Sequence, residues 1–90
     1  MGTKVHINSL IAQYANNQSI VEVNGDTVGQ CLEDLVQQFP GLRKALFNED
    51  NELLDYIEIY VNKERIYPTW FATPAKPGDE LHLMFMFDGG

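Results

Sequence analysis

One segment of this 90-residue sequence has the apolar spacing of an amphipathic helix, and strand-like segments lie on both sides of it. Its apolar residues recur every three or four positions, and they are Val28, Cys31, Leu32, Leu35, Val36 and Phe39. Thr27 followed by Gln30 is the pattern of an N-cap with a capping box, and Pro40 disfavours helical geometry at the residue before it. We therefore predict a helix between Thr27 and Phe39, with one more short helical turn at 42–47. A helix of this length has one apolar face, which must pack against a sheet made by the rest of the chain.

The segments around the helix have the alternation or the β-branched composition of strands. They are residues 4–10, 19–24, 56–62, 66–67 and 81–87. Asn16-Asn17 predicts a turn between the first two segments, which suggests an antiparallel hairpin. Residues 62–65 and 76–79 predict two further turns. The sequence therefore predicts an α+β fold, with a mixed sheet of four to five strands and one main helix on one face.

Composition and charge limit the classes of partner. The formal net charge is −7, from six basic and thirteen acidic residues, which argues against binding to nucleic-acid phosphates or anionic membranes. A basic groove on a protein partner is the better electrostatic match. Cys31 is the only cysteine, so no internal disulfide can form. The N-terminal residues lack a signal-peptide core, and no apolar run approaches the roughly 18 residues of a membrane span, so we expect a cytoplasmic protein.

Two glycines, Gly89 and Gly90, end the sequence directly after the apolar run of the last predicted strand and Asp88. Glycine has no Cβ, so such a tail can enter a channel too narrow for other residues. We predict a folded domain over residues 1–87 and a flexible reactive tail over 88–90. In this interpretation the carboxylate of Gly90 is the chemical handle, whether the chain ends there or is trimmed to that point. The alternative is a frayed terminus without a role.

Several short motifs follow one another in a defined order along the chain. They are Gly25-Asp26-Thr27-Val28-Gly29, Leu32, Leu35, Phe39-Pro40-Gly41-Leu42, Ile59-Tyr60-Val61-Asn62, Pro77-Gly78-Asp79-Glu80-Leu81 and Gly89-Gly90. In this order, and with the glycine pair at this distance from the last strand, the chain resembles the ThiS/MoaD family of ubiquitin-like sulfur carrier proteins. The stretch from Asp50 to Asp55 is more similar to the cysteine-synthesis type of carrier than to the thiamine type. The resemblance implies a ubiquitin-like β-grasp, with the first and last strands parallel at the centre of the sheet.

The resemblance also implies a chemistry for the tail. An E1-like, ATP-dependent enzyme adenylates the Gly90 carboxylate, a sulfur donor converts it to a thiocarboxylate, and Gly89 gives the tail a slim approach. The sulfur then passes to an enzyme that makes a cofactor or a sulfur-containing amino acid. The chain is accordingly expected to be a protein co-substrate that is not itself an enzyme and binds no cofactor. The receiving pathway stays open among cysteine or homocysteine, thiamine, molybdopterin and other products.

Two alternatives to the sulfur carrier remain open at this stage. One is a ubiquitin-like modifier that is attached through Gly90 to lysines of other proteins, because the same activation serves both uses. The other is a non-catalytic β-grasp interaction module whose glycines are idle. Relatives in the family often carry small residues or proline before the glycines, whereas residues 84–87 here are bulky. This difference leaves the tail chemistry intact and the identity of the partners open.

The alternation of the last strand predicts a docking surface beside the tail. If Leu81 and Leu83 face the helix, the intervening residues face outward, and Tyr60 of the neighbouring strand faces the same way. The predicted partner-binding residues are Tyr60, His82, Met84, Met86, Phe87 and Asp88. A methionine-containing apolar patch suits protein partners, because methionine adapts to several surfaces. The alternative is that a loop or a second copy of the chain covers this patch.

Other residues with reactive side chains receive simpler interpretations. His6 and His82 would be neighbours if the first and last strands pair, but no histidine or cysteine spacing predicts a metal site, and we expect none. Cys31 lies on the apolar stripe of the helix and is interpreted as a core residue. The acidic stretch from Glu49 to Asp55 lacks the pattern of a calcium loop and is interpreted as solvated surface.

Overall fold

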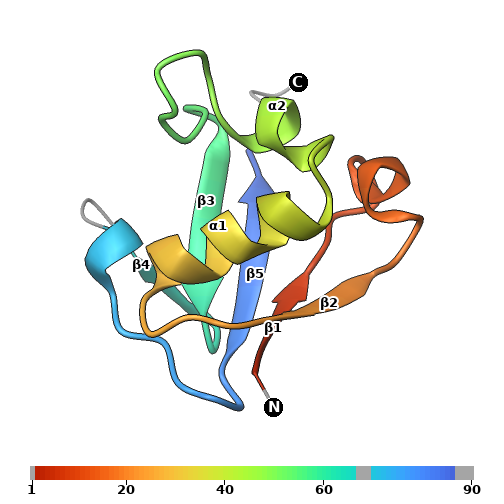
Figure 1. Cartoon of the computed structure of the whole chain (residues 1–90). Helices are drawn as coiled ribbons and strands as arrows, with labels where there is room; N and C mark the ends of the chain where they lie inside the picture. Colours follow the sequence, from red (N-terminus) through yellow and green to blue (C-terminus); the bar gives the residue numbers. More distant parts are fainter. Residues whose placement is uncertain (1, 67–69, 87–90) are drawn as a thin grey trace.

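The computed structural model describes residues 2–66 and 70–86, in which one long helix crosses one face of a five-stranded sheet (Figure 1). In chain order the elements are β1 (Thr3–His6), the 3-10 helix η1 (Ala12–Ala15), β2 (Ile20–Val23), α1 (Val28–Gln38), α2 (Leu42–Leu46), β3 (Ile57–Val61), β4 (Glu64–Ile66), the 3-10 helix η2 (Trp70–Ala72) and β5 (Glu80–Phe85). The predicted α+β class with one main helix is confirmed.

The strand order of the sheet is β2-β1-β5-β3-β4. β1 and β5 are parallel and lie at the centre, and the other three pairings are antiparallel. The parallel pairing of the first and last strands, which followed from the family resemblance, is confirmed. The first and last strands of the chain therefore lie side by side, and their outward-facing residues form one surface.

Helix α1 begins where the sequence predicts, at the N-cap Thr27. The backbone N–H of Gln30 donates to Oγ1 of Thr27 at 3.1 Å, and the side-chain oxygen of Gln30 accepts from the backbone N–H of Asp26 at 2.8 Å. The helix ends at Gln38 with Phe39 as its C-cap, as Pro40 requires. Among the described residues, neither this helix nor any other is long and apolar enough to cross a membrane.

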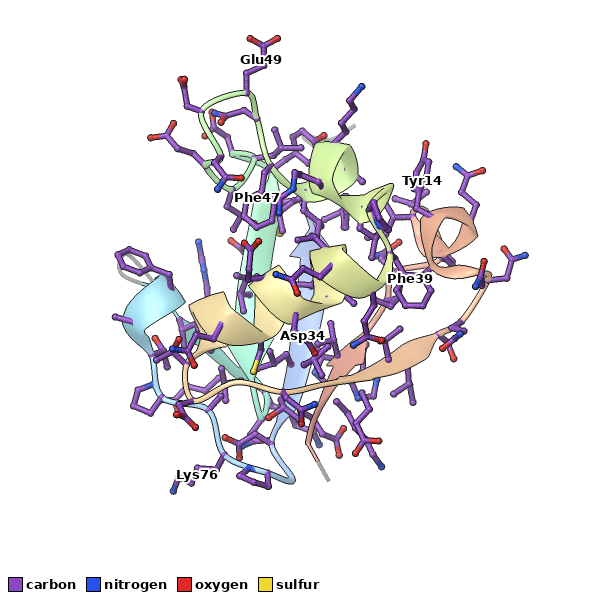
Figure 2. All side chains as sticks on the ribbon, in the orientation of Figure 1. Tyr14, Asp34, Phe39, Phe47, Glu49 and Lys76 are labelled. Atoms are coloured by element: carbon purple, nitrogen blue, oxygen red, sulfur yellow. The ribbon has the colours of Figure 1, made fainter. Side chains whose placement is uncertain are left out.

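The core lies between α1 and the face of the sheet that the helix covers. The buried residues of α1 are Val28, Cys31, Leu32, Leu35 and Val36. The buried residues of the strands are Thr3, Val5, Val21, Val23, Ile57, Ile59, Leu81 and Leu83. Each large apolar side chain removed from water contributes about 1.5–3 kcal/mol relative to an exposed one. On the flank of the helix next to the end of β2, the carboxylate of Asp34 accepts from the backbone N–H of Asn24 and from the side-chain amide of Gln38 (Figure 2).

The first strand is shorter than the predicted 4–10 segment and stops at His6. Asn8 is the physical reason, because its side-chain oxygen accepts from the backbone N–H of Leu10 at 2.8 Å. Its carbonyl also accepts from the backbone N–H of Ile11, so the chain turns into η1 and leaves the ladder. The predicted turn at Asn16-Asn17 is confirmed, with both residues in the left-handed region at φ 55° and 60°.

The β3–β4 connection is tighter than the predicted turn over 62–65. Asn62 and Lys63 alone form the turn, with φ values of 50° and 75°, and two positive φ values match the twist of a two-residue hairpin. Glu64 and Arg65 therefore belong to β4, which the sequence placed at 66–67. The ends of three other predicted strands also shift, since β2 spans 20–23, β3 spans 57–61 and β5 spans 80–85. Residues 67 and 87 lie outside the described residues.

Candidate functional site

The sheet face opposite α1 carries one continuous row of side chains across all five strands. The row is Ile20, His6, His82, Tyr60 and Arg65, each paired with the next across the ladder. Its central members are half-buried and its two ends are exposed. Neighbouring positions on the same face are Glu22, Lys4, Glu80, Glu58 and Met84. We call these ten residues the open face.

Part of the predicted docking surface gathers on the open face. Tyr60, His82 and Met84 line a shallow hollow of about 340 Å³ together with Lys63. Met84 is 45% exposed, and Met86, just beyond the end of β5, is 53% exposed. The predicted outward orientation of His82, Met84 and Met86 agrees with the structure, while their role in docking stays a prediction.

The remaining predicted site residues are Phe87, Asp88, Gly89 and Gly90, which lie outside the described residues. The division into a domain over 1–87 and a tail over 88–90 therefore stays a prediction. The structure does show the segment that leads to these residues. β5 is a central strand, and after its last residue the backbone N–H of Met86 still donates to the carbonyl of Tyr56.

The turn before β5 holds the start of this central strand in place. Gly78 has φ +95°, and open space surrounds the position of an added Cβ, so backbone conformation alone favours glycine here. The carboxylate of Asp79 accepts from the side-chain amide of Asn62 and from the backbone N–H of Lys76. Both hydrogen bonds lower the pKa of Asp79, and the bond from Asn62 has the larger effect. The side-chain oxygen of Asn62 also accepts from the backbone N–H of Glu80 at 3.0 Å. Asn62 thus joins the β3–β4 turn to the first residue of β5.

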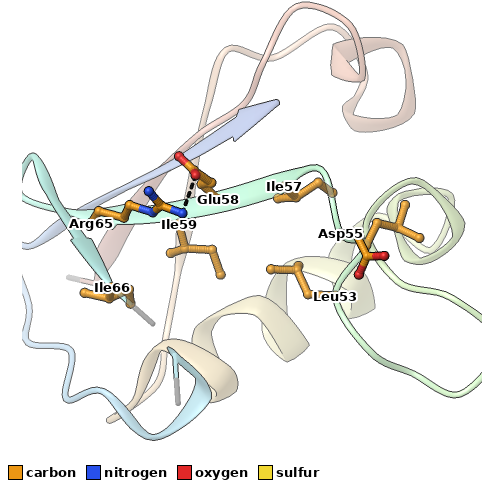
Figure 3. A pocket seen from close by; sticks show the side chains of 8 residues that line it. Leu53, Asp55, Ile57, Glu58, Ile59, Arg65 and Ile66 are labelled. Carbon is orange, nitrogen blue, oxygen red and sulfur yellow. Dashed lines mark ion pairs between the residues drawn. The ribbon is translucent and has the colours of Figure 1, made fainter. Parts of the chain in front are cut away.

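Tyr60 is positioned by charged neighbours on β3 and β4. Its hydroxyl donates to Oε1 of Glu58 at 3.2 Å, and the same carboxylate forms an ion pair with Arg65 (Figure 3). The Glu58 side chain is only 13% exposed, so the guanidinium balances a charge that is partly withdrawn from water. A second hollow, of about 290 Å³, lies beside this pair and extends to Leu53 and Ile66 (Figure 3). The sequence did not indicate it, because it depends on how the loop before β3 folds back.

Two histidines and a carboxylate meet at the centre of the open face. The rings of His6 and His82 stack with centroids 4.0 Å apart and planes 8° apart. Nε2 of His6 lies 2.7 Å from Oε1 of Glu80, and this hydrogen bond is the main reason that the pKa of Glu80 is lowered. Partial burial, and then the positive charge of a protonated His6, lower the pKa of His82. His82 is therefore a neutral imidazole at pH 7.

Cys31 is fully buried on the core-facing side of α1, as the sequence predicts. Burial raises the pKa of its thiol, and nearby carboxylates add to that effect, so the sulfur stays protonated. The group lies away from the open face and is part of the core.

A mixed sheet with two parallel central strands, crossed by one helix, defines the ubiquitin-like β-grasp class of proteins, and solved structures similar to this chain share that fold. Within that class, the model of the ThiS family matches residues 5–90. The chain belongs to the ThiS family, which confirms the family that the sequence motifs indicated.

Sulfur carriers and a protein modifier are both among the relatives. Small archaeal modifier protein 1 of Haloferax volcanii is 39% identical over 82 residues, which cover 89% of this chain and 91% of that protein. Sulfur carrier protein CysO of Mycobacterium tuberculosis is 27% identical over 93 residues and is matched along the whole of both chains. A chain in the crystal structure of the Amycolatopsis orientalis BexX/CysO complex has a TM-score of 0.87 and 26% identity, covering 99% of this chain and 100% of that one.

Proposed function

We propose that this protein is a sulfur carrier that cycles between a carboxylate and a thiocarboxylate at Gly90, when Gly90 is the terminal residue. The observation that carries the proposal is the extent of the family match, which runs from residue 5 through the glycine pair to residue 90. The similarity to a sulfur carrier protein along the whole chain supports the same assignment.

The proposed chemistry takes place on the main chain and uses partner enzymes for catalysis. An E1-like enzyme binds ATP, and the Gly90 carboxylate attacks the α-phosphorus, so that pyrophosphate leaves and an acyl adenylate forms. A sulfur nucleophile from a donor then adds to the acyl carbon, and AMP leaves with the electron pair of the broken C–O bond. In the acceptor enzyme the thiocarboxylate sulfur attacks an electrophilic substrate, and water then hydrolyses the resulting thioester, which leaves the sulfur on the substrate and returns the Gly90 carboxylate. The chain acts as a co-substrate throughout, and the activating enzyme is the partner that binds ATP.

The tail must reach the active site of a partner while the folded domain docks outside it. A fully extended chain spans at most about 3.3–3.6 Å per residue, so the three residues of the predicted tail, 88–90, reach roughly 10 Å in the bound state. Fixing each residue of the tail in one conformation costs about 1–2 kcal/mol of backbone entropy, which contacts of the folded domain must offset. The proposed docking residues next to the tail are Tyr60, His82, Met84, Met86, Phe87 and Asp88.

The net charge of −7 favours a partner with a basic surface around its channel. The partners in the proposal are the activating enzyme and the sulfur-accepting enzyme. The BexX/CysO complex supports partner docking, because a relative of the same fold is there assembled with a second protein.

The proposal is tested by incubating the full chain with its cognate activating enzyme, ATP and sulfide. Intact-mass spectrometry should show replacement of one oxygen by one sulfur, and fragmentation should locate the change at Gly90. Deletion of Gly90 should abolish the change while urea unfolding stays the same. A mass change that survives the deletion, or no change with any activating enzyme of the source organism, would contradict the carrier function.

A second function is attachment to other proteins, favoured by the 39% identity with an archaeal modifier protein. Activation is shared, and only the acceptor differs, since a lysine amine then takes the acyl group from Gly90. Mass spectrometry of cell extracts for lysines that carry a terminal Gly89-Gly90 remnant distinguishes the two. Remnants on many proteins indicate a modifier, and their absence beside an abundant thiocarboxylate indicates a dedicated carrier.

A further inference from the structure

The parallel pairing of β1 and β5 brings His6, Glu80 and His82 into one cluster on the open face. Glu80 and His82 are two residues apart on β5 and therefore point to the same side of the sheet. His6 pairs directly with His82 across the ladder. One ligand atom from each of the three residues lies within 4.8 Å of the other two.

We propose that His6, Glu80 and His82 bind a divalent late first-row transition ion, with Zn²⁺ as the reference ion. Two imidazoles and one carboxylate are a donor set that suits zinc, copper and nickel, whereas magnesium and calcium prefer oxygen donors. Tetrahedral zinc, with bonds of about 2.0–2.2 Å, holds its ligand atoms about 3.3–3.6 Å apart. The widest separation in the cluster, at most 4.8 Å, therefore needs to shorten by about 1 Å, while Nε2 of His6 and Oε1 of Glu80, 2.7 Å apart, need to move apart slightly.

The contraction requires a defined movement of the two rings. A metal lies in the plane of each imidazole that binds it, and two parallel rings cannot both point at one ion. The stack of His6 on His82 therefore opens by rotation about the Cβ–Cγ bonds when the ion binds. Exposure leaves room for this movement, since the side chains of His6 and Glu80 are 28% and 48% exposed. The fourth coordination position faces solvent and takes water.

Binding of the ion also changes the hydrogen bonding within the cluster. The ion takes the place of the hydrogen bond between His6 and Glu80, and the histidine proton moves to the other ring nitrogen.

Charged neighbours set the strength of the site. Lys4 lies opposite Glu80 in the β1–β5 ladder, and the ammonium of Lys63 is close enough to lower the pKa of His82. Both positive charges therefore oppose the binding of a cation. Glu22 lies opposite Lys4 in the β1–β2 ladder and partly offsets the positive charge of Lys4. Glu58 on β3 is already in an ion pair with Arg65. We therefore expect weaker binding than at a closed four-ligand zinc site, and a loss of affinity on acidification as protons compete for the rings.

Calorimetric titration of the metal-free full chain with ZnCl₂ at neutral pH tests the site. We expect one ion per chain. The affinity for zinc should fall by roughly tenfold or more, relative to the unchanged chain, after His6→Ala, His82→Ala or Glu80→Gln. Glu22→Gln is the matched control, because it removes an equal charge from the same face outside the cluster. Ring-proton NMR signals of both histidines should shift together on zinc binding, and MgCl₂ should leave them in place.

Several outcomes would overturn the proposal. They are no zinc binding, equal binding in His6→Ala and Glu80→Gln, equal loss in the Glu22→Gln control, and equal response to magnesium. Glu80 is exposed and His6 is only half-buried, so their variants decide the matter even where His82→Ala unfolds. Deletion of Gly90 should leave zinc binding unchanged, which keeps this test separate from that of the sulfur-carrier function.

Discussion

The two faces of the sheet are made by alternate residues of the same strands, yet they have opposite chemistry. On β5, Leu81 and Leu83 are buried beneath α1, while His82 and Met84 between and beside them lie on the open face. The covered face consists almost entirely of aliphatic side chains, and the open face carries rings, charges and a methionine. Packing explains the identities of the first set. The second set contributes little to packing, so its composition points to contacts with other molecules.

The largest expected effect is a difference in stability between alanine substitutions at two adjacent positions of β5, one on each face of the sheet. Leu83→Ala removes a side chain that is 2% exposed and should lower the free energy of unfolding by about 2–5 kcal/mol. Met84→Ala, at 45% exposure, should cost less than about 1 kcal/mol. Urea unfolding followed by circular dichroism measures both. Equal losses would mean that the open face is also part of the stabilising core.

The next effect concerns function and compares two positions on the open face itself. Met84→Lys places a charge in the proposed docking surface and should slow thiocarboxylate formation about tenfold, as expected for a central contact. Ile20→Lys makes the same change of charge at the distant edge strand, at a similar exposure of 46%, and should change the rate less than about twofold. The rate is read by intact-mass spectrometry at limiting activating enzyme. Equal slowing would show a general charge effect without local docking.

A smaller effect is expected from the cap that anchors the covering helix. Thr27→Ala removes the acceptor for the backbone N–H of Gln30 and should cost about 1 kcal/mol, while Thr27→Ser keeps the hydroxyl and most of the stability. Thermal unfolding should show a decrease of roughly 4–8 °C for the alanine variant. The histidine NMR signals of the open face should not change. A change there would show that the two faces are coupled through the sheet.

The smallest expected effect is the pH dependence from the open face. His82 has a pKa below its ordinary value of 6.5, so the unfolded chain binds this proton more readily than the folded one. Its contribution to stability is complete above pH 6.5 and is lost as the pH falls toward the lowered value. Glu80 and Asp79 also have lowered pKa values, so their contributions are lost only below their ordinary values of 4.5 and 3.8.

Substitution of His82 by glutamine should remove only the upper part of this dependence. In the glutamine variant the free energy of unfolding should change less with pH near 6.5 than in the unchanged chain. Its dependence on pH near 4 should stay the same. An unchanged profile near 6.5 would show that His82 titrates alike in the folded and unfolded chains.

The sequence predicts the end of a helix or strand best where a single residue determines it. Thr27 and Pro40 gave both ends of α1, and simple alternation separated Leu81 from His82. It failed where a side chain competes with the ladder, since Asn8 ends β1 four residues before the apolar pattern does. It also failed at Asn62 and Lys63, where the left-handed turn is shorter than its polar composition indicated.

The candidate sites show the same limit. The outward set Tyr60, His82 and Met84 followed from periodicity once the family resemblance had placed their strands together. The His6 and Glu80 contact joins residues 74 positions apart, and no local spacing predicts a 2.7 Å approach between them. It depends on the register of a parallel pair, which only the folded sheet defines.

The central position of β5 has a consequence for the order of events during synthesis. The ribosome delivers this strand after the other four, although in the described sheet it lies between the β2-β1 pair and the β3-β4 pair and joins them. The nascent chain can form the two hairpins and α1 early, but it cannot close the sheet until β5 emerges. Such non-local closure is slow compared with the formation of local structure. Gly89 follows the last residue of β5 by four positions. An activating enzyme that docks on the assembled sheet would therefore meet only molecules whose sheet is complete.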